Sequence, residues 1–315
     1  MAISHHIKEI GRGAAGARAL SRDAAADLLG QILDGHCSDL EIGAFCVAMR
    51  IKGETPEEMA GFLDALDARL HKLPASTRPV VVLPSYNGAR KLPVLTPLLA
   101  ALLAREGLPV LIHGCATEER RVSTQDVLAA GGVQPQSTDR AIACGEWRFV
   151  ATESLHAGLR RLLDVRRAIG LRNPAHSLVK LMNPVRGAAL VVGSYTHPEY
   201  AESMAATFQL MGSSAMLLRG TEGEPVADAR RSPRMALFLQ GAAHGVHEAQ
   251  AGPLSALPTL PDTIDAHSTH QFIAAVLAGE IAVPAPIAAQ VGHIVRACEA
   301  LEAATKPAPP RRLAA

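Results

Sequence analysis

The basic side chains gather in one segment of the sequence, and phosphate binding is the chemistry that such a cluster suits. Residues 160–180 contain six positive charges and one acid, Asp164. Most arginines on a helix are solvated, so no single one of them identifies a site. A chain of net charge +1 that collects positive side chains on one face focuses a positive potential there, which attracts a phosphate-bearing partner. The basic residues of this segment are Arg160, Arg161, Arg166, Arg167, Arg172 and Lys180.

Further basic residues follow two apolar runs, 80–83 and 109–113, that are predicted to be strands. In an open α/β sheet, ligands bind in the crevice beyond the carboxyl ends of the strands. We therefore expect these side chains to lie near such a crevice. They are Arg90, Lys91, Arg120 and Arg121.

The first of these runs leads into a turn that only partly matches a phosphate-binding loop. The stretch "VVVLPSYNGARK", residues 80–91, combines a strand with a glycine-containing turn, and α/β proteins often hold phosphates on the backbone amides of such turns. However, this turn has one glycine, no carboxylate and no Gly-Lys-Ser/Thr ending. These residues alone leave open whether the turn is a phosphate site, a degenerate one or an ordinary turn.

Groups that would bind a metal or attack a substrate are sparse. His244 and His247 lie three residues apart, but the glycine-rich segment before them favours a loop and no third ligand follows. "HGC" at 113–115 places a cysteine beside a histidine without any local signature of a nucleophile. Glu222 and Glu224 follow a predicted strand and have the ligand type that Mg²⁺ prefers, although a solvated loop is the simpler interpretation. We predict no metal site.

Composition limits the function classes. An aromatic content of 3% makes base stacking a secondary contribution to any nucleic-acid binding. The five cysteines are odd in number and form no C-x-x-C pair, which indicates reduced thiols. The first residues lack the apolar segment of a signal peptide, and no apolar run reaches the roughly 18 residues of a membrane span. These features predict a cytoplasmic protein that has no membrane partner.

The elements that must position these residues fall into two groups. Residues 1–73 show helical patterns only, with Ser21 and Asp39 as expected N-caps. The strongest local signal is "TPEE" at 55–58, which combines a capping box with proline at the first helical position.

After a linker at 73–80, short apolar runs alternate with helical patterns, which predicts a mostly parallel sheet covered by helices. The expected strands are 80–83, 109–113, 147–151, 188–193, 214–218 and 235–239.

The order of these pieces resembles one known superfamily along nearly the whole chain. A small helical domain ends in "KGETPEE", an α/β domain follows, and "VRRAIGLRNPAHSLVKLMNP" stands near its middle. This order resembles the anthranilate phosphoribosyltransferase and class II nucleoside phosphorylase superfamily, which has the glycosyl transferase family 3 fold. The segments "IKEIGRG", "RIKGE", "PSYNGARK", "RNPAHSLVKL", "THPEY" and "GTEGE" more specifically resemble the YbiB branch.

The resemblance implies an α/β fold class with a small all-helical N-terminal domain hinged to a larger α/β domain. The helical domain would span residues 1–75, be joined by part of 160–185, and form a homodimer. The α/β domain would span residues 76–305 and hold a mostly parallel central sheet, with the ligand cleft between the two domains. The composition of residues 306–315 itself predicts a flexible basic tail.

The resemblance also implies a phosphoribosyl site, which this chain has altered. The superfamily wraps pyrophosphate in a G-T-G-G-D loop, whereas this chain has Ser85, Tyr86, Asn87 and Gly88 in that place. The Asp-Glu pair that binds Mg²⁺ in the enzymes is replaced by Pro225 and Val226. Val179 and Lys180 stand in the place of a Gly-Pro motif, while Arg166, Arg167 and Arg172 match enzyme arginines. We therefore expect no catalytic residue and no cofactor.

The leading hypothesis that follows is a homodimer that binds DNA or RNA without sequence preference through a basic cleft. The predicted phosphate contacts are Arg90, Lys91, Arg120, Arg121, Arg166, Arg167, Arg172 and Lys180. Tyr86, His113 and His176 are candidates for contact with a base or ligand. One alternative is a glycosyl- or phosphoribosyltransferase with an altered donor site, in which Glu222 and Glu224 would hold Mg²⁺. A second alternative is an interaction protein whose dimer faces bind another protein.

Overall fold

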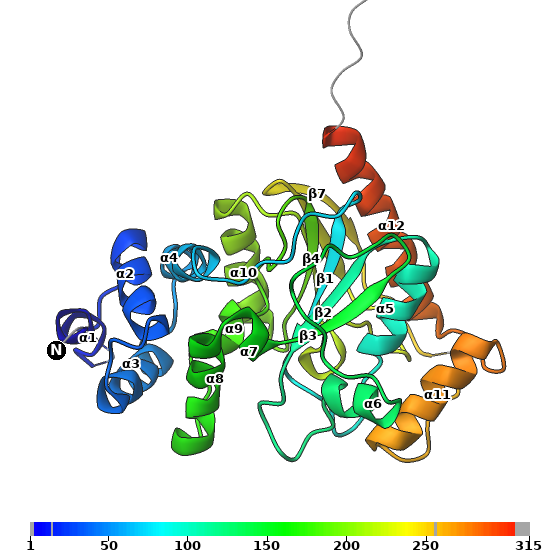
Figure 1. Ribbon diagram of the computed structural model, residues 1–315, viewed down its shortest axis with the longest axis horizontal. Coiled ribbons are helices and arrows are strands. Elements are labelled where there is room, and N and C mark those ends of the chain that lie inside the picture. Colours follow the sequence, from blue (N-terminus) through cyan, green and yellow to red (C-terminus); the bar gives the residue numbers. More distant parts are fainter. Residues whose placement is uncertain (1–2, 14, 255–256, 306–315) are drawn as a thin grey trace, which may run out of the picture.

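The computed structural model of the protein describes residues 3–13, 15–254 and 257–305, in a helical part and an α/β part (Figure 1). The expected tail at 306–315 lies outside these residues. No helix among them is long and apolar enough to cross a membrane.

The helical part contains four N-terminal helices and receives a second, distant segment. Its helices are α1 (Ser4–Ile10), α2 (Arg22–Leu33), α3 (Asp39–Lys52) and α4 (Pro56–Asp67). Helices α8 (Ala157–Ile169) and α9 (Ala175–Leu178) come from the middle of the chain, and α8 contacts α2 and α3 while α9 contacts α4 (Figure 1). The basic segment 160–180 is therefore held against the helical part.

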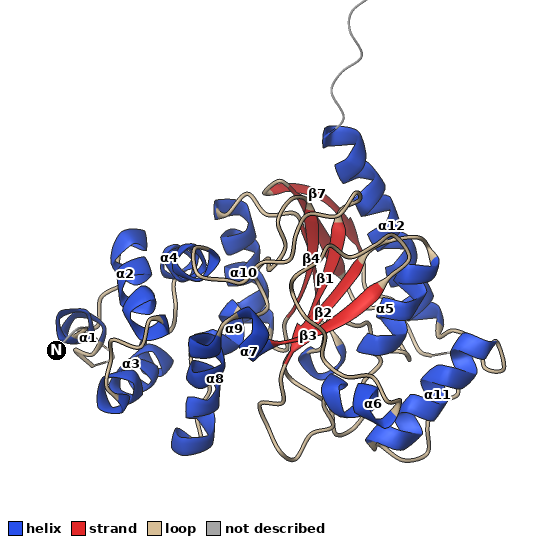
Figure 2. Ribbon diagram, in the orientation of Figure 1, coloured by secondary structure: helices blue, strands red, loops and turns tan. Residues whose placement is uncertain are grey.

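The α/β part is built on a seven-stranded sheet in the order β3-β2-β1-β4-β5-β6-β7 (Figure 2). The first five strands in this order are parallel, and β6 and β7 are antiparallel, so the prediction of a mostly parallel sheet is confirmed. The strands are β1 (Val80–Ser85), β2 (Val110–Gly114), β3 (Trp147–Ala151), β4 (Ala189–Ser194), β5 (Ala215–Leu218), β6 (Met235–Leu239) and β7 (Ala242–His247).

Strand β7 corrects the interpretation of the stretch that contains His244 and His247 as a loop. This segment pairs with β6 at the edge of the sheet and is mostly exposed. Small and polar side chains on an exposed edge strand leave no apolar alternation to detect, so its sequence resembles a loop. His247 contacts Ser232 through its Nε2 atom at 3.2 Å.

The sheet separates two hydrophobic cores, because successive side chains of a strand point to opposite faces. Val80 and Val82 of β1 join the core that continues into the helical part, whereas Val81 and Leu83 join the other core. Helix α10 (Pro198–Leu210) lies on the first side and contacts α4. The second side is covered by α5 (Thr96–Arg105), α6 (Thr124–Ala130), α11 (Ala266–Ala278) and α12 (Ala285–Thr305), as Figure 2 shows. Helix α7 (Thr152–Leu155) follows β3 directly.

The predicted caps in the helical part are confirmed with one correction. The hydroxyl of Ser21 accepts a hydrogen bond from the Ala24 amide, and Thr55 forms the capping box with Glu58. Helix α3 is capped by Ser38 and not by Asp39. Ser38 has the extended backbone that an N-cap needs, while Asp39 is already the first helical residue.

Glu58 also links three segments of the helical part. Its fully buried carboxylate accepts hydrogen bonds from the Leu20 amide at 2.8 Å and from Lys52 Nζ at 2.6 Å, in addition to the Thr55 amide at 3.0 Å. A buried charge is tolerated when it is paired and hydrogen-bonded in this way.

We expect Glu58→Ala to lower the free energy of unfolding by about 3–5 kcal/mol, because it leaves Lys52 as a buried and unpaired charge. Glu57→Ala is the matched control, since Glu57 lies beside Glu58 in the same first turn of α4 but is exposed. Urea unfolding followed by circular dichroism measures both variants. Equal destabilisation by the two substitutions would contradict this role of Glu58.

Candidate functional site

A cleft of about 700 Å³ lies between the helical part and the carboxyl ends of the parallel strands. Met49, Arg50 and Glu54 line it from the helical part, Lys180 lines it from the segment held against that part, and Arg121 lines it from the α/β part. The carboxyl end of a parallel sheet is where α/β proteins place their ligands. The structure thus places part of the basic set at the expected edge of the sheet.

The turn after β1 is held by a carboxylate of the chain itself. Glu224 is fully buried, and its Oε1 atom accepts hydrogen bonds from the amides of Asn87 and Gly88, each at 2.8 Å. Its Oε2 atom accepts hydrogen bonds from the hydroxyls of Ser85 and Thr96. Both oxygens of Glu224 therefore accept hydrogen bonds from the predicted degenerate phosphoribosyl loop, and Thr96 of α5 adds one further donor.

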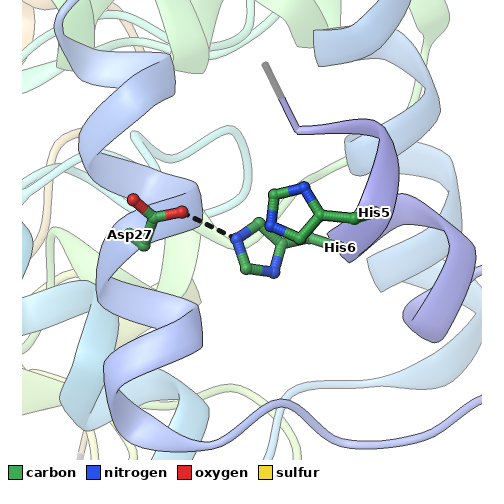
Figure 3. Close-up of side chains that lie close together, drawn as sticks. All are labelled: His5, His6 and Asp27. Atoms are coloured by element: carbon green, nitrogen blue, oxygen red, sulfur yellow. Dashed lines mark hydrogen bonds and ion pairs between the residues drawn. The ribbon is translucent and has the colours of Figure 1, made fainter. Parts of the chain in front are cut away.

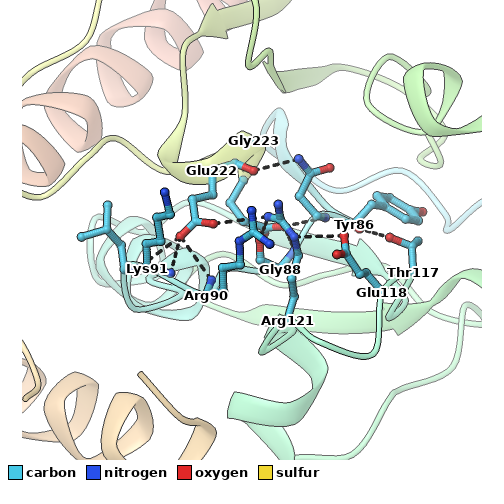
Figure 4. A network of polar contacts seen from close by, with 12 residues as sticks. Tyr86, Gly88, Arg90, Lys91, Thr117, Glu118, Arg121, Glu222 and Gly223 are labelled. Atoms are coloured by element: carbon cyan, nitrogen blue, oxygen red, sulfur yellow. Dashed lines mark hydrogen bonds and ion pairs between the residues drawn. The ribbon is translucent and has the colours of Figure 1, made fainter. Parts of the chain in front are cut away.

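A second carboxylate binds the amides that come next in the chain. Glu222 Oε1 accepts hydrogen bonds from the amides of Arg90, Lys91 and Leu92 at 3.2, 2.8 and 3.1 Å (Figure 4). Its Oε2 atom accepts a hydrogen bond from Arg121 Nη1 at 3.4 Å. Neither Glu222 nor Glu224 belongs to the solvated loop that the sequence suggested.

Two candidates for base or ligand contact are buried instead. Tyr86 is 2% exposed and His113 is fully buried, and a hydrogen bond of 2.7 Å joins Tyr86 Oη to His113 Nδ1. Thr152 donates a second hydrogen bond to Tyr86 Oη. Burial lowers the pKa of His113 to about 3, so the ring is neutral. Tyr86 and His113 are therefore packing residues, which corrects the expectation that they face a ligand.

Arg172, His176 and Lys180 also line the cleft, as predicted, but they differ in the hydrogen bonds that their side chains make. Among the described residues, no hydrogen bond or ion pair engages the guanidinium of Arg172. Burial, together with the charges of Arg166 and Arg121, lowers the pKa of Arg172. Lys180 is buried and donates to the carbonyl oxygens of Ser194 at 3.2 Å and Gly223 at 3.0 Å.

Burial lowers the pKa of Lys180 to about 8, with Arg172 contributing. Burial and the same arginine lower the pKa of His176 to about 3, so its ring is neutral. The Nε2 atom of His176 is buried without a hydrogen-bond partner in the described structure. The cleft wall therefore holds an unpaired cation beside a polar atom that also lacks a partner.

The remaining predicted basic residues do not line the cleft. Arg166 is paired with Glu118 at 2.8 Å, and Arg167 is about half exposed beside Asp164. The other three are exposed on the surface and are Arg90, Lys91 and Arg120. Sequence reasoning missed Arg50 and Glu54, because their approach to the cleft depends on the position of the helical part, for which the local sequence holds no signal.

A group of potential metal ligands lies elsewhere, in the helical part. Ligand atoms of His5, His6 and Asp27 all lie within 4.8 Å of one another (Figure 3). His6 Nε2 is 2.8 Å from Asp27 Oδ2, and this contact joins α1 to α2 and lowers the pKa of Asp27. The group escaped the sequence analysis because Asp27 lies 21 residues from His6.

Comparisons with known proteins agree with this architecture. Residues 4–69 match the family model described as the glycosyl transferase family, helical bundle domain. The chain is 38% identical to a protein of Escherichia coli named uncharacterized protein YbiB, over 90% of this chain and 91% of that one. It is also 31% identical to the anthranilate phosphoribosyltransferase of Methylococcus capsulatus, over 63% of this chain and 60% of that enzyme.

Solved structures show the same fold. The anthranilate phosphoribosyltransferase of Thermus thermophilus superimposes with a TM-score of 0.73 at 22% identity, covering 95% of this chain and 89% of that one. The Saccharomyces cerevisiae enzyme in complex with PRPP and Mg gives a TM-score of 0.68 at 15% identity, with the same coverage of both chains. Identities this low extend the likeness to the fold alone.

Proposed function

The chain belongs to the YbiB branch of the anthranilate phosphoribosyltransferase and class II nucleoside phosphorylase superfamily, and we propose that its cleft binds a phosphate-bearing sugar or nucleotide. In this proposal the protein is a glycosyl- or phosphoribosyltransferase with an altered donor site. Positive side chains of the cleft wall would bind the phosphate directly, in place of the Mg²⁺ that the Asp-Glu pair holds in the related enzymes.

The unpaired guanidinium of Arg172 is the observation that carries this proposal. Burying a charge without a partner is costly, and its lowered pKa reports that cost. A phosphate in the cleft would accept charge-assisted hydrogen bonds from the planar fork of this guanidinium. Arg172 is therefore preorganised for an anion that the described chain does not itself supply.

Two neighbours extend the same binding surface. The neutral ring of His176 presents an unpartnered Nε2 atom, which has a hydrogen to donate or a lone pair to accept one, depending on its tautomer. Lys180 adds a positive charge below a pH of about 8. In a transfer reaction these groups would stabilise the negative charge that develops on a departing phosphate.

Glu222 and Glu224 do not fit the role of Mg²⁺ ligands in this site. Both oxygens of Glu224 and one oxygen of Glu222 already accept two or three hydrogen bonds each, which leaves them few free lone pairs. Their partners are N–H and O–H donors, whose hydrogens point at the oxygen atoms that a cation would need. We therefore assign no step of the proposed reaction to a bound metal.

Nucleic-acid binding is a second candidate function, which the exposed basic residues at the turn after β1 favour. The Arg90 and Lys91 side chains are exposed and make no hydrogen bond or ion pair within the described chain. Flexible basic side chains on a surface follow a phosphate backbone without reading its sequence. DNA or RNA would then extend from the cleft across this turn.

Dimerisation through the helical part is a further proposal, supported by one exposed apolar face. Leu40, Val47 and Ile51 of α3 are 84%, 39% and 64% exposed. Their spacing of seven and four residues places them on one side of the helix. A second copy of this chain would remove this apolar face from water.

We expect Arg172→Gln to weaken the binding of ribose 5-phosphate about 10- to 100-fold, which corresponds to the roughly 1.5–3 kcal/mol of a charged hydrogen bond. Isothermal titration calorimetry measures the affinity, without added Mg²⁺ and with it. Arg186→Gln is the control, because Arg186 is exposed and does not line the cleft. Absence of binding to the unaltered protein, or equal loss in the two variants, would overturn the proposal.

For the nucleic-acid candidate, we expect oligonucleotide affinity to fall steeply as salt rises, because binding releases counterions. Reversing charge with Arg90→Glu and Lys91→Glu together should weaken binding to all sequences alike and reduce the salt slope by about 1–2. The control is Lys8→Glu with Arg12→Glu, which makes the same charge change on and beside α1. Fluorescence anisotropy of a labelled oligonucleotide measures the affinity at each salt concentration. Binding that does not depend on salt, or no binding at low salt, would exclude this function.

The dimer proposal predicts that the purified protein has twice the mass of one chain by light scattering. Ile51→Asp should shift it to the monomer, since a charge would be buried in the interface. Leu257→Asp, at a site 69% exposed outside the helical part, should leave the dimer intact. A monomeric unaltered protein at micromolar concentration would be the contrary result.

A further inference from the structure

Two anion-binding positions of the turn at 85–92 are occupied by side chains of the protein itself. Three consecutive backbone amides, those of residues 90–92, converge on one oxygen of Glu222 (Figure 4). Two further amides, those of Asn87 and Gly88, converge on one oxygen of Glu224. Successive amides that point at one place form a concave site for an anion. Here each such site holds a carboxylate.

The two carboxylates differ in access to the cleft. Glu224 is fully buried and lies behind the cleft wall, whereas the Glu222 side chain is 15% exposed and lines the cleft. The Oε1 atom of Glu222 accepts hydrogen bonds from backbone amides that could otherwise donate to a phosphate oxygen. A phosphate cannot bind these amides while they donate to Glu222. A phosphate placed next to the Glu222 carboxylate would also be repelled by its negative charge.

The backbone of this segment is shaped to present the carboxylates. Glu222 has φ 50°, in the left-handed region that residues other than glycine rarely adopt. Gly223 has φ 89°, and a Cβ atom there would lie 2.0 Å from Asn87 Nδ2. Asn87 donates to the Glu222 carbonyl oxygen at 2.8 Å, so the segment and the turn lock together. Such local strain persists where the surrounding contacts hold it.

We propose that Glu222 and Glu224 determine the specificity of the cleft by acting as built-in anions that exclude a pyrophosphate group from the turn. A ligand would then place a single phosphate at Arg172 and Lys180, and the substrate class would be a monophosphorylated sugar or nucleotide. The preference for a monophosphate rests on the proposed function, whereas the exclusion of pyrophosphate by Glu222 stands without it.

The test removes the accessible carboxylate with Glu222→Gly, because glycine suits the positive φ at this position. The variant frees three amides and removes the ion pair to Arg121, whose Nη1 atom keeps its hydrogen bond to the Gly88 carbonyl oxygen. We expect inorganic pyrophosphate to bind at least tenfold more tightly than to the unaltered protein. Isothermal titration calorimetry measures this affinity. Glu222→Asn is a second variant that tolerates the same backbone, and it covers the case in which the glycine variant does not fold.

Glu118→Ala is the matched control. It removes one negative charge beside Arg121, the arginine that Glu222 also contacts, but Glu118 accepts no backbone amide of the turn. A gain in pyrophosphate affinity with the Glu222 variants and not with Glu118→Ala supports the proposal. Equal gains in both would assign the effect to net charge, and no gain in folded Glu222 variants would overturn it.

A separate titration with ribose 5-phosphate distinguishes this inference from the proposed function. Binding to the unaltered protein that is at least tenfold tighter than that of inorganic pyrophosphate supports the preference for one phosphate. If ribose 5-phosphate does not bind while the Glu222 variants gain pyrophosphate affinity, the proposed function fails and the exclusion by Glu222 stands. Tight binding of pyrophosphate to the unaltered protein would overturn the exclusion itself.

Discussion

The buried carboxylate of Glu224 joins the turn after β1 to the segment after β5, and the form of the cleft depends on this contact. A fully buried carboxylate is stable only when several donors replace the water that it has lost. The amides of Asn87 and Gly88 and the hydroxyls of Ser85 and Thr96 supply these donors. The two segments are fixed to each other because separating them would leave all of these groups without partners.

The charge of the cleft depends on which of its arginines form ion pairs with acidic side chains of the protein. Arg121 is paired with Glu118 and Glu222, and Arg166 is paired with Glu118. Arg172 has no such partner in the described structure and lies close enough to both arginines for their charges to lower its pKa. The acids thus neutralise the rim toward the turn, and positive charge remains at the end of the cleft formed by Arg172 and Lys180. The end of the cleft at Arg172 is therefore suited to the anion of a ligand, whereas carboxylates of the protein already neutralise the end toward the turn.

Local patterns predicted the scaffold closely and the site only in part. The capping box at Thr55 and the apolar runs of the parallel strands were readable because each depends on residues a few positions apart. The edge strand β7 was missed, since its exposed, small side chains show no alternation. Tyr86 and His113 were expected to face a ligand, but they hydrogen-bond to each other inside the core. Their mutual burial depends on β1 and β2 being neighbours in the sheet, which no local pattern shows.

The sequence by itself determined the helical and α/β parts, the order of most strands along the chain, and the loss of the glycines and acids typical of the phosphoribosyl loop. These properties are local, because helix caps, strand periodicity and loop composition act over a few residues. Only the tertiary structure decided that Glu222 and Glu224 accept hydrogen bonds from the backbone amides of that turn and that Arg172 has no partner among the described residues. Both outcomes depend on segments more than 40 residues apart in the chain meeting in a desolvated space, where the position of each partner decides whether a charge is satisfied.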